Sequence, residues 1–356
     1  MNSIESRKER EEQEEQEEQE EQEEQEEQEE QEEQDNDLVE NFFTLTDANV
    51  AHELVQAAEY CAITYCIPRD NLKNGELKQS CSISACFDGE EGRSIVYQFQ
   101  SEISGLIVRD DTNKEFVVAF KGTTTKNEWT IDFSISYQKY HPYTVSKGIN
   151  KKSFACSHCK VHAGFYGATN YFMEEAFPVL LKLHKEKPDY SFRVTGHSLG
   201  AALALLAAIE LRLMDLDVIL VTLAGPKIGD SRFTSWVDQI FNTKSLVKTL
   251  KGGADKLPIN SFSRVTNKGD VVPLAPLIGM GFTHAGCEIK ISNSRLKVKG
   301  KWSYLHEVQN LADLSKVVKE FIRKREWEAA LAKKEVSSKH INYFMVINEC
   351  KYSNSS

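Results

Sequence analysis

Residues 191–208 read SFRVTGHSLGAALALLAA and join a short run of strand-forming residues to a helix rich in Ala and Leu. Gly196 and Gly200 stand on either side of Ser198. Glycine weakens the interior of a strand or a helix, so two glycines at this junction indicate a tight turn with close neighbours. The context favours a nucleophile elbow, in which the turn lifts the serine hydroxyl above a sheet. The alternative is a serine that only caps the helix.

The elements around this stretch predict an α/β fold. Apolar runs bounded by turn residues predict strands, and apolar residues at helical spacing predict helices. The two kinds of element alternate, which indicates a mostly parallel central sheet flanked by helices. Strands are expected at 94–100, 104–111, 115–122, 191–195, 218–225 and 261–266, and helices at 38–66, at 165–186 and from residue 199.

The N-terminus differs in composition from the rest of the chain. Residues 11–34 are tandem copies of Glu-Glu-Gln and contribute −16 to a net charge of −11, so the other residues together carry +5. A run without apolar residues cannot bury a core, and its like charges repel. We expect residues 1–37 to form a low-complexity, disordered acidic tail and residues 38–356 to form one domain.

A nucleophilic serine needs a base and a carboxylate that orients the base. After an elbow, the expected order along the chain is serine, then Asp or Glu, then His. Asp270, in RVTNKGDVVPLAP, follows a predicted strand and would lie at the same sheet edge as the elbow, although a surface turn could also explain it. His284, His306 and His340 follow, and we expect His340 in a loop before a final apolar strand.

From about residue 50 onward, the chain resembles the fungal-type class 3 lipases, an α/β-hydrolase family. The blocks that carry the resemblance come in family order: FVVAFKGT, KVHAGF, VTGHSLGAALALL, LAGPKIGD, RVTNKGDVVPLAP, GFTHAGCEI and HINYF. The resemblance implies a catalytic triad of Ser198, Asp270 and His340. It places His284 near the site without making it the base.

An acyl-transfer site also needs donors for a negative oxygen. The Leu199 N–H at the helix N-terminus would supply one. By resemblance Thr123 supplies the second, and residues 124–133, TTKNEWTIDF, form the lid. Trp129 and Phe133 would share one face of a short lid helix and contact substrate. The lid is otherwise polar, which leaves strong interfacial activation open.

The eight cysteines favour an oxidised, secreted protein, whereas the N-terminal MNSIESRKER lacks the apolar core of a signal peptide and favours the cytoplasm. Two pairs are close enough in sequence to form disulfides. A zinc site with His158 is the alternative for the second pair. The resemblance pairs Cys66 with Cys350 and leaves Cys287 without an obvious partner. The two close pairs are Cys81 with Cys86 and Cys156 with Cys159.

Together these features predict a serine carboxylic-ester hydrolase that acts on acylglycerols and needs no metal or organic cofactor. Its expected partners are a lipid or other ester substrate and, transiently, a lipid interface that the lid contacts. No nucleic acid is expected, and no run reaches the roughly 20 apolar residues of a membrane span. The alternatives are a phospholipase A1-type enzyme, a soluble carboxylesterase, or a catalytically silent lipid-binding or interaction protein. A charged helix at 307–335 is expected to pack on the domain, with membrane contact as the minor alternative.

Overall fold

The protein is described by a computed structural model. It covers residues 42–45, 48–67, 74–77, 92–123, 136–150, 156–276, 280–292, 295–299, 334–348 and 350. The predicted tail at 1–37, the lid at 124–133 and most of the predicted helix at 307–335 lie outside these residues. All statements below concern the described part of the chain.

A ten-stranded sheet forms the centre of this part, in the order β1-β12-β11-β10-β9-β8-β5-β4-β3-β2. The five strands from β5 to β11 run parallel, and the strands on both sides of them run antiparallel. The strands are β1 (Phe42–Leu45), β2 (Gly75–Glu76), β3 (Arg93–Phe99), β4 (Gly105–Asp110), β5 (Glu115–Phe120), β8 (Ser191–His197), β9 (Val218–Leu223), β10 (Ser261–Asn267), β11 (Cys287–Ser292) and β12 (Arg295–Lys299).

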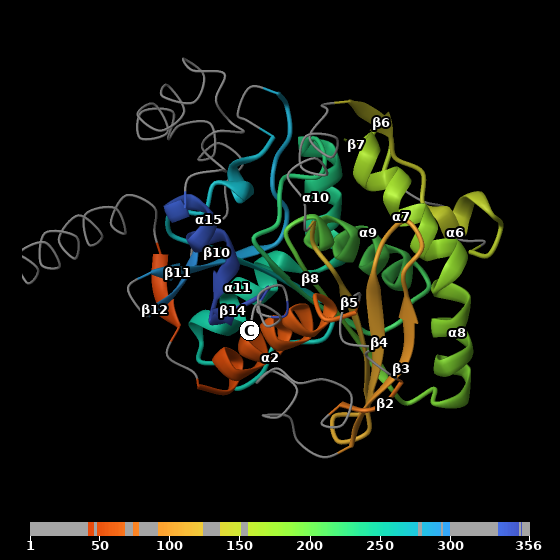
Figure 1. The fold of residues 1–356 in the computed structure, drawn as a ribbon. Coiled ribbons are helices and arrows are strands. Elements are labelled where there is room, and N and C mark those ends of the chain that lie inside the picture. The colour runs from red at the N-terminus through yellow and green to blue at the C-terminus, as the bar shows by residue number, and fades with distance from the viewer. Residues whose placement is uncertain are drawn as a thin grey trace, which may run out of the picture.

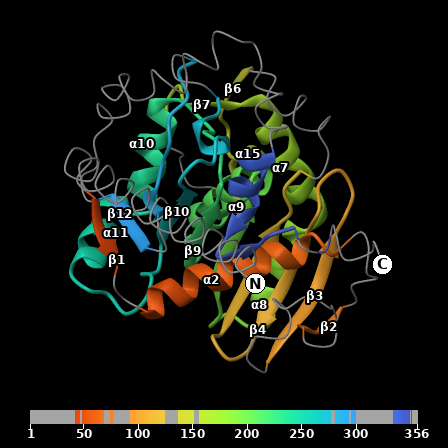
Figure 2. The ribbon, with the colours of Figure 1, turned by 60° about the vertical axis from the view of Figure 1, so that its left-hand side comes forward.

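Helices cover both faces of the sheet (Figures 1 and 2). Every residue of β5 and β9 is buried, as expected for parallel strands packed on both sides. One face packs on α7 (Ala163–Glu175), α8 (Phe177–Glu186), α9 (Leu199–Leu213) and α10 (Ser231–Ile240). The other packs on α2 (Ala48–Thr64) and α11 (Thr243–Lys251). The predicted α/β-hydrolase-type arrangement is therefore confirmed.

The remaining elements are short. β6 (Tyr137–Lys139) and β7 (Lys160–His162) form a separate two-stranded sheet, and α6 (Tyr143–Ser146) lies between them in the chain. The 3-10 helix η1 (Val272–Leu274) follows β10. The last described segment contains α15 (Lys334–Ile341), β13 (Asn342–Tyr343) and β14 (Met345–Val346).

Two predicted helices are wrong in their bounds. The helix expected from residue 38 begins at Ala48, because residues 42–45 form β1 and pair with β12 at the sheet edge. The helix expected over 165–186 is two helices that meet at Ala176. Pro178 lies in the first turn of the second helix, where its missing N–H has no helical partner to lose.

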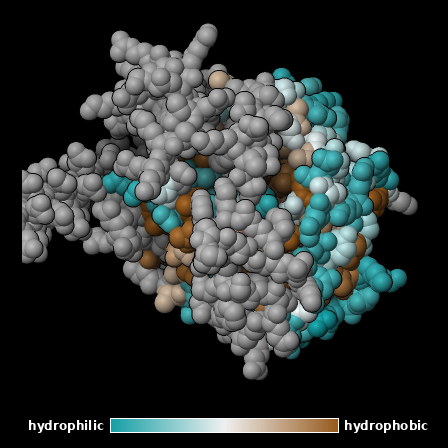
Figure 3. All heavy atoms as spheres, viewed as in Figure 1, coloured by the Kyte–Doolittle hydropathy of each residue, from teal (hydrophilic) through white to brown (hydrophobic). Residues whose placement is uncertain are grey.

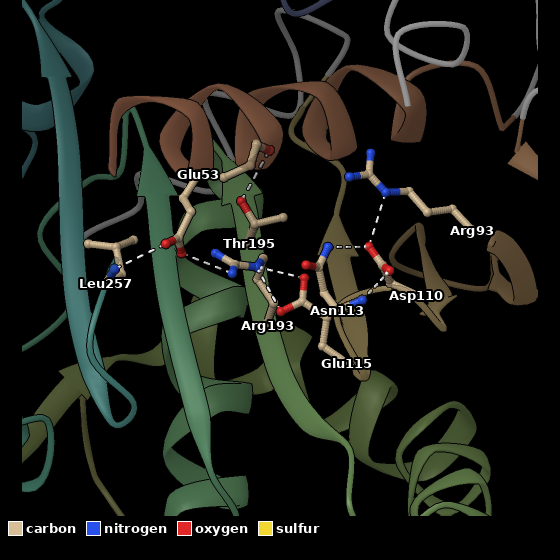
Figure 4. Close-up of polar contacts among 9 residues, drawn as sticks. Glu53, Arg93, Asp110, Asn113, Glu115, Arg193, Thr195 and Leu257 are labelled. Atoms are coloured by element: carbon tan, nitrogen blue, oxygen red, sulfur yellow. Dashed lines mark hydrogen bonds and ion pairs between the residues drawn. The ribbon is translucent and has the colours of Figure 1, made fainter. Parts of the chain in front are cut away.

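A buried ion cluster lies beneath α2 (Figure 4). Arg193 on β8 donates through Nε to the Glu115 carboxylate on β5, at 2.9 and 3.1 Å, and through a terminal nitrogen to Glu53 on α2, at 3.0 Å. Glu53 also accepts the Leu257 N–H at 3.1 Å. These contacts fix the direction in which α2 crosses the sheet.

The exposed face over α7 and α8 is mostly hydrophilic, with small and separate apolar areas (Figure 3). Among the described residues, no helix combines the length and the apolar character that a bilayer crossing requires.

Candidate active site

Ser198 occupies a strained turn between β8 and α9. Its backbone angles are φ 60° and ψ −125°, and a positive φ is unusual for a residue with a side chain. Its side chain makes no capping hydrogen bond to α9, so the helix-cap alternative is wrong. The strain is consistent with a nucleophile elbow, where the turn fixes the direction of the hydroxyl.

The glycines at this turn are explained by close backbone contacts. A Cβ on Gly196 would lie 2.1 Å from the Gly200 carbonyl oxygen, and one on Gly200 would lie 2.4 Å from the Phe120 carbonyl oxygen. A Cβ on Gly122 would lie 2.6 Å from the His197 carbonyl oxygen and 3.2 Å from the Ser198 Cβ. The loop after β5 therefore passes directly beside the elbow.

Both predicted oxyanion donors belong to these two close segments. Leu199 is the first residue of α9, so its N–H lies in the turn where helical N–H groups have no acceptor within the helix. Thr123 follows Gly122 in the loop beside the elbow. The arrangement brings the Thr123 and Leu199 segments together at the C-terminal ends of the parallel strands.

Asp270 lies shortly after β10 and is buried. Its carboxylate accepts hydrogen bonds from His340 Nδ1 at 3.0 and 3.1 Å, from the Tyr343 hydroxyl at 2.6 Å and from the Val272 N–H at 3.0 Å. Burial by itself would raise the pKa of Asp270. The charge of His340 and the three donors outweigh burial, and the pKa is lowered.

His340 is the histidine that the fold brings to Asp270. It lies in the last turn of α15 rather than in the predicted loop, because the chain stays helical up to Ile341 before β13 begins. His284 contacts the carbonyl oxygen of Pro273 instead, at 2.6 Å, and it lines a small pocket behind α9. His306 lies outside the described residues.

Three further residues complete the site, and sequence reasoning did not single them out. Tyr343, three letters after His340 in HINYF, donates to Asp270. His197 precedes the serine, and its Nε2 contacts the His340 carbonyl oxygen at 2.8 Å. Tyr65 contacts His197 Nδ1 at 2.9 Å. His197 and Tyr343 lie inside the matching blocks, whereas Tyr65 lies in none of them, and only the fold shows which groups the three residues meet.

His197 remains neutral in this environment. It is buried, and burial together with the neighbouring His340 lowers the pKa of His197 to about 3. The two rings lie close together, with centroids 4.6 Å apart. A neutral His197 adds no positive charge beside the imidazole of His340.

The disulfide predictions are answered in part. Cys66 bonds to Cys350, with Cα atoms 5.2 Å apart, and Cys156 bonds to Cys159. Cys287 is a buried free thiol. The Cys156–Cys159 bond leaves no thiolate pair for the zinc alternative with His158, and no cluster of three metal-ligating side chains occurs in the described ranges. Cys81 and Cys86, like the lid residues Trp129 and Phe133, lie outside those ranges.

Comparison with known proteins gives the same class of fold. The crystal structure of Lip2 lipase from Yarrowia lipolytica superposes with a TM-score of 0.65 and 23% identity, over 86% of this chain and 97% of that chain. This level of identity shows the fold alone. The chain therefore has the fold of an α/β-hydrolase, with a serine elbow and an Asp–His pair at one sheet edge.

The family follows from the sequence matches. Residues 117–280 match the family described as Lipase (class 3). The LIH1 protein of Saccharomyces cerevisiae is 37% identical over 180 residues, which span 49% of this chain and 54% of LIH1. Secreted mono- and diacylglycerol lipase 2 of Gibberella zeae is 34% identical over 189 residues, spanning 51% of this chain and 44% of that protein. Residues 117–280 are thus similar to class 3 lipases, and the chain spans about half the length of these relatives.

Proposed function

We propose that this protein is a serine carboxylic-ester hydrolase that acts on acylglycerols. The observation that carries the proposal is the buried hydrogen bond from His340 to Asp270, beside the strained elbow of Ser198. A carboxylate that holds the Nδ1 proton leaves Nε2 as the basic nitrogen of the ring. A serine, a base and an orienting carboxylate at one sheet edge are the groups that acyl transfer needs.

The proposed reaction has two halves. His340 takes the proton of the Ser198 hydroxyl, and the serine oxygen attacks the ester carbonyl carbon. The N–H groups of Leu199 and Thr123 stabilise the negative oxygen of the tetrahedral intermediate. His340 then protonates the leaving alcohol, and water repeats the sequence on the acyl-enzyme. Asp270 stabilises the imidazolium that forms in each half.

The proposed substrate class rests on the names of similar proteins rather than on the geometry of the site. A Gibberella zeae relative is named a mono- and diacylglycerol lipase, and it is 34% identical to this chain over 189 residues. We propose acylglycerols on this basis, with Trp129 and Phe133 of the lid contacting the acyl chain. The phospholipase A1-type and soluble carboxylesterase alternatives use the same machinery, and the hydrolysis assay below separates them.

We also propose that the protein works in an oxidising compartment. Cys66 and Cys350 are far apart in the sequence and joined in the structure, and such bonds persist where thiols are not kept reduced. The Gibberella zeae relative is named as secreted. Mass spectrometry of protein purified without reductant should find the Cys66–Cys350 peptide pair. Free thiols at both positions would contradict this part of the proposal.

The activity is tested by product analysis on three substrates: an emulsified triacylglycerol, a phospholipid and a short soluble ester, each below and above its solubility limit. We expect fatty acid release from the acylglycerol, and no release by Ser198→Ala. Faster release from the phospholipid or the soluble ester would favour one of the alternatives. No release by folded wild-type protein from any of the three would contradict the enzyme proposal and favour a silent binding protein.

A further inference from the structure

Polar contacts connect β8 to α2 and to Tyr65 in the turn that directly follows α2. Glu53 pairs with Arg193, the Thr195 hydroxyl lies 3.4 Å from the Ala57 carbonyl oxygen, and Tyr65 contacts His197. The residues from α2 and the following turn are spaced by four or eight positions, and the residues from β8 are spaced by two. Four helical residues rise about 6 Å and two strand residues about 6.6 Å, so the two periods match. The first two contacts are visible in Figure 4.

The direction of the hydrogen bonds at Tyr65 follows from the groups involved. A backbone carbonyl oxygen can only accept, so His197 Nε2 must carry the proton in its 2.8 Å contact with the His340 carbonyl. In a neutral imidazole, Nδ1 is then the acceptor. The Tyr65 hydroxyl therefore donates to Nδ1. A directed chain of two hydrogen bonds runs from Tyr65 through His197 to the main chain of His340.

Tyr65 also contacts the loop that carries Thr123. A Cβ on Gly122 would lie 2.4 Å from the Tyr65 hydroxyl oxygen, so only a glycine leaves room there. The Lys121 ammonium lies 5.9 Å from the centre of the Tyr65 ring, within the range of a cation–π contact. Tyr65 thus contacts the loop that carries Thr123 directly. Through His197, it is also connected to the turn at Ser198 and to the main chain of His340.

The chain beyond His340 is tied to the same place. Cys66, the next residue after Tyr65, bonds to Cys350, which follows α15, β13 and β14. His340 is thereby restrained at its main chain by His197, at its ring by Asp270 and through the following segment by the disulfide.

We infer that Tyr65 and His197 are positioning residues for the proposed reaction: they set the placement of His340 relative to Ser198 by holding the His340 main chain. This inference rests on the proposed function. Neither side chain touches the reacting atoms. Tyr65 and His197 instead increase the fraction of time in which His340 lies within reach of the Ser198 proton. Reaction rates are sensitive to such positioning.

The first test is Tyr65→Phe, which removes one hydroxyl and keeps the ring. Loss of one hydrogen bond predicts a fall in kcat of about 3–10-fold with KM unchanged. Tyr60→Phe is the matched control, because Tyr60 lies in the last turns of α2 shortly before Tyr65, is buried, and its hydroxyl makes no hydrogen bond in the described structure. Cys61→Ala is the second control, because it loses a contact from α2 to Thr195 without touching His197. Both controls should keep the wild-type kcat.

The second test asks whether Tyr65 acts through His197. His197→Gln keeps an N–H that can donate to the His340 carbonyl, whereas His197→Leu keeps none. We expect kcat to fall less in the Gln variant, and Tyr65→Phe to change kcat less than 2-fold in the His197→Leu background. The rate of labelling by a fluorophosphonate should follow the same order.

Two outcomes overturn the inference: Tyr65→Phe with the kcat of Tyr60→Phe, or the full Tyr65→Phe loss in the His197→Leu background. Both are measured against an active wild-type protein. If the wild-type protein hydrolyses no ester and takes no label, the proposed function has failed instead.

Discussion

The two ends of the α2–β8 contact are held by different chemistry. At the end near Glu53, the strand residue is a permanently charged Arg193 clamped by two carboxylates. At the end near Tyr65, the strand residue is a neutral His197 that passes a hydrogen bond to the backbone of His340. β8 supplies the strand residue at both ends, and the facing residues come from α2 and from the turn that follows it.

The difference follows from the changes of charge that occur near each end during the proposed reaction. The Arg193 cluster contains no residue that changes charge in the proposed reaction, so a fixed ion pair can align the helix there. In the proposed reaction His340 alternates between neutral and positive, and a fixed positive neighbour would oppose its protonation by Coulomb repulsion. Burial keeps His197 neutral, so it holds the main chain of His340 without adding charge.

The largest effect is expected at the reacting end, from Asp270→Asn. An amide cannot stabilise the imidazolium and can hold His340 in the wrong tautomer, so kcat/KM on a soluble ester should fall roughly 10³–10⁴-fold. Asp189→Asn is the control, because Asp189 is exposed and pairs with exposed Lys114. A loss smaller than about tenfold for Asp270→Asn would contradict the assigned role.

At the other end, Arg193→Met should act on stability. It leaves Glu115 buried without its cation, and breaking a buried pair costs roughly 3–5 kcal/mol of unfolding free energy. Lys114→Met breaks an exposed pair and should cost less than about 1 kcal/mol. Urea denaturation measures both. Equal losses of unfolding free energy in the two variants would show that the cluster does not align α2. A large change in kcat/KM of folded Arg193→Met would show that this end also affects the reaction.

Acid should destabilise the protein because it protonates His197, which is neutral in the native state. The pKa of His197 falls from 6.5 in the unfolded chain to about 3 in the fold, so between these values the unfolded chain binds the extra proton. Stability is therefore present above pH 6.5 and is lost as the pH falls, by roughly 3 kcal/mol between pH 6.5 and 4. Buried His162, with a pKa of about 4, adds a loss of the same sign.

Unfolding free energy measured against pH checks this effect. His197→Gln should flatten the curve in that interval, leaving the contribution of His162. An unchanged slope in His197→Gln would show that His197 is not neutral in the native state.

The smallest effect is expected from Tyr343→Phe. It removes one of the donors to the Asp270 carboxylate, and a hydrogen bond to a charged group is worth about 1.5–3 kcal/mol at most. The other donors to the carboxylate remain, so we expect the fall in kcat to lie at the low end of this range, about tenfold. Tyr60→Phe serves again as the control. A loss as large as that of Asp270→Asn would mean that Tyr343 contributes more than a hydrogen bond to the carboxylate.

Local patterns predicted the tight turn at Ser198 and the ends of the parallel strands well. Ser198 stands between glycines whose neighbours are backbone atoms of the next turn and strand, and that close contact can be read from residue type alone. Asp270 follows a β-branched run that became β10. The choice of His340 over His284 needed the family resemblance, because spacing alone left both open.

The remaining features depend on contacts between distant segments. Tyr65 meets His197 across more than a hundred residues, and no local pattern marks that pair. The prediction of a helix from residue 38 failed because residues 42–45 form the edge strand β1, which gains its hydrogen bonds from β12, far along the chain. The α-helical setting of His340 was missed because the polar sequence before it has no clear apolar stripe.

The central claim is that Ser198 is a nucleophile activated by His340 and Asp270. Labelling with a fluorophosphonate probe, followed by mass spectrometry of the modified peptide, tests it most directly. The prediction is one modified residue, Ser198, in the wild-type protein and no modification of folded Ser198→Ala. Modification of a different residue, or no modification of folded wild-type protein, would contradict the claim.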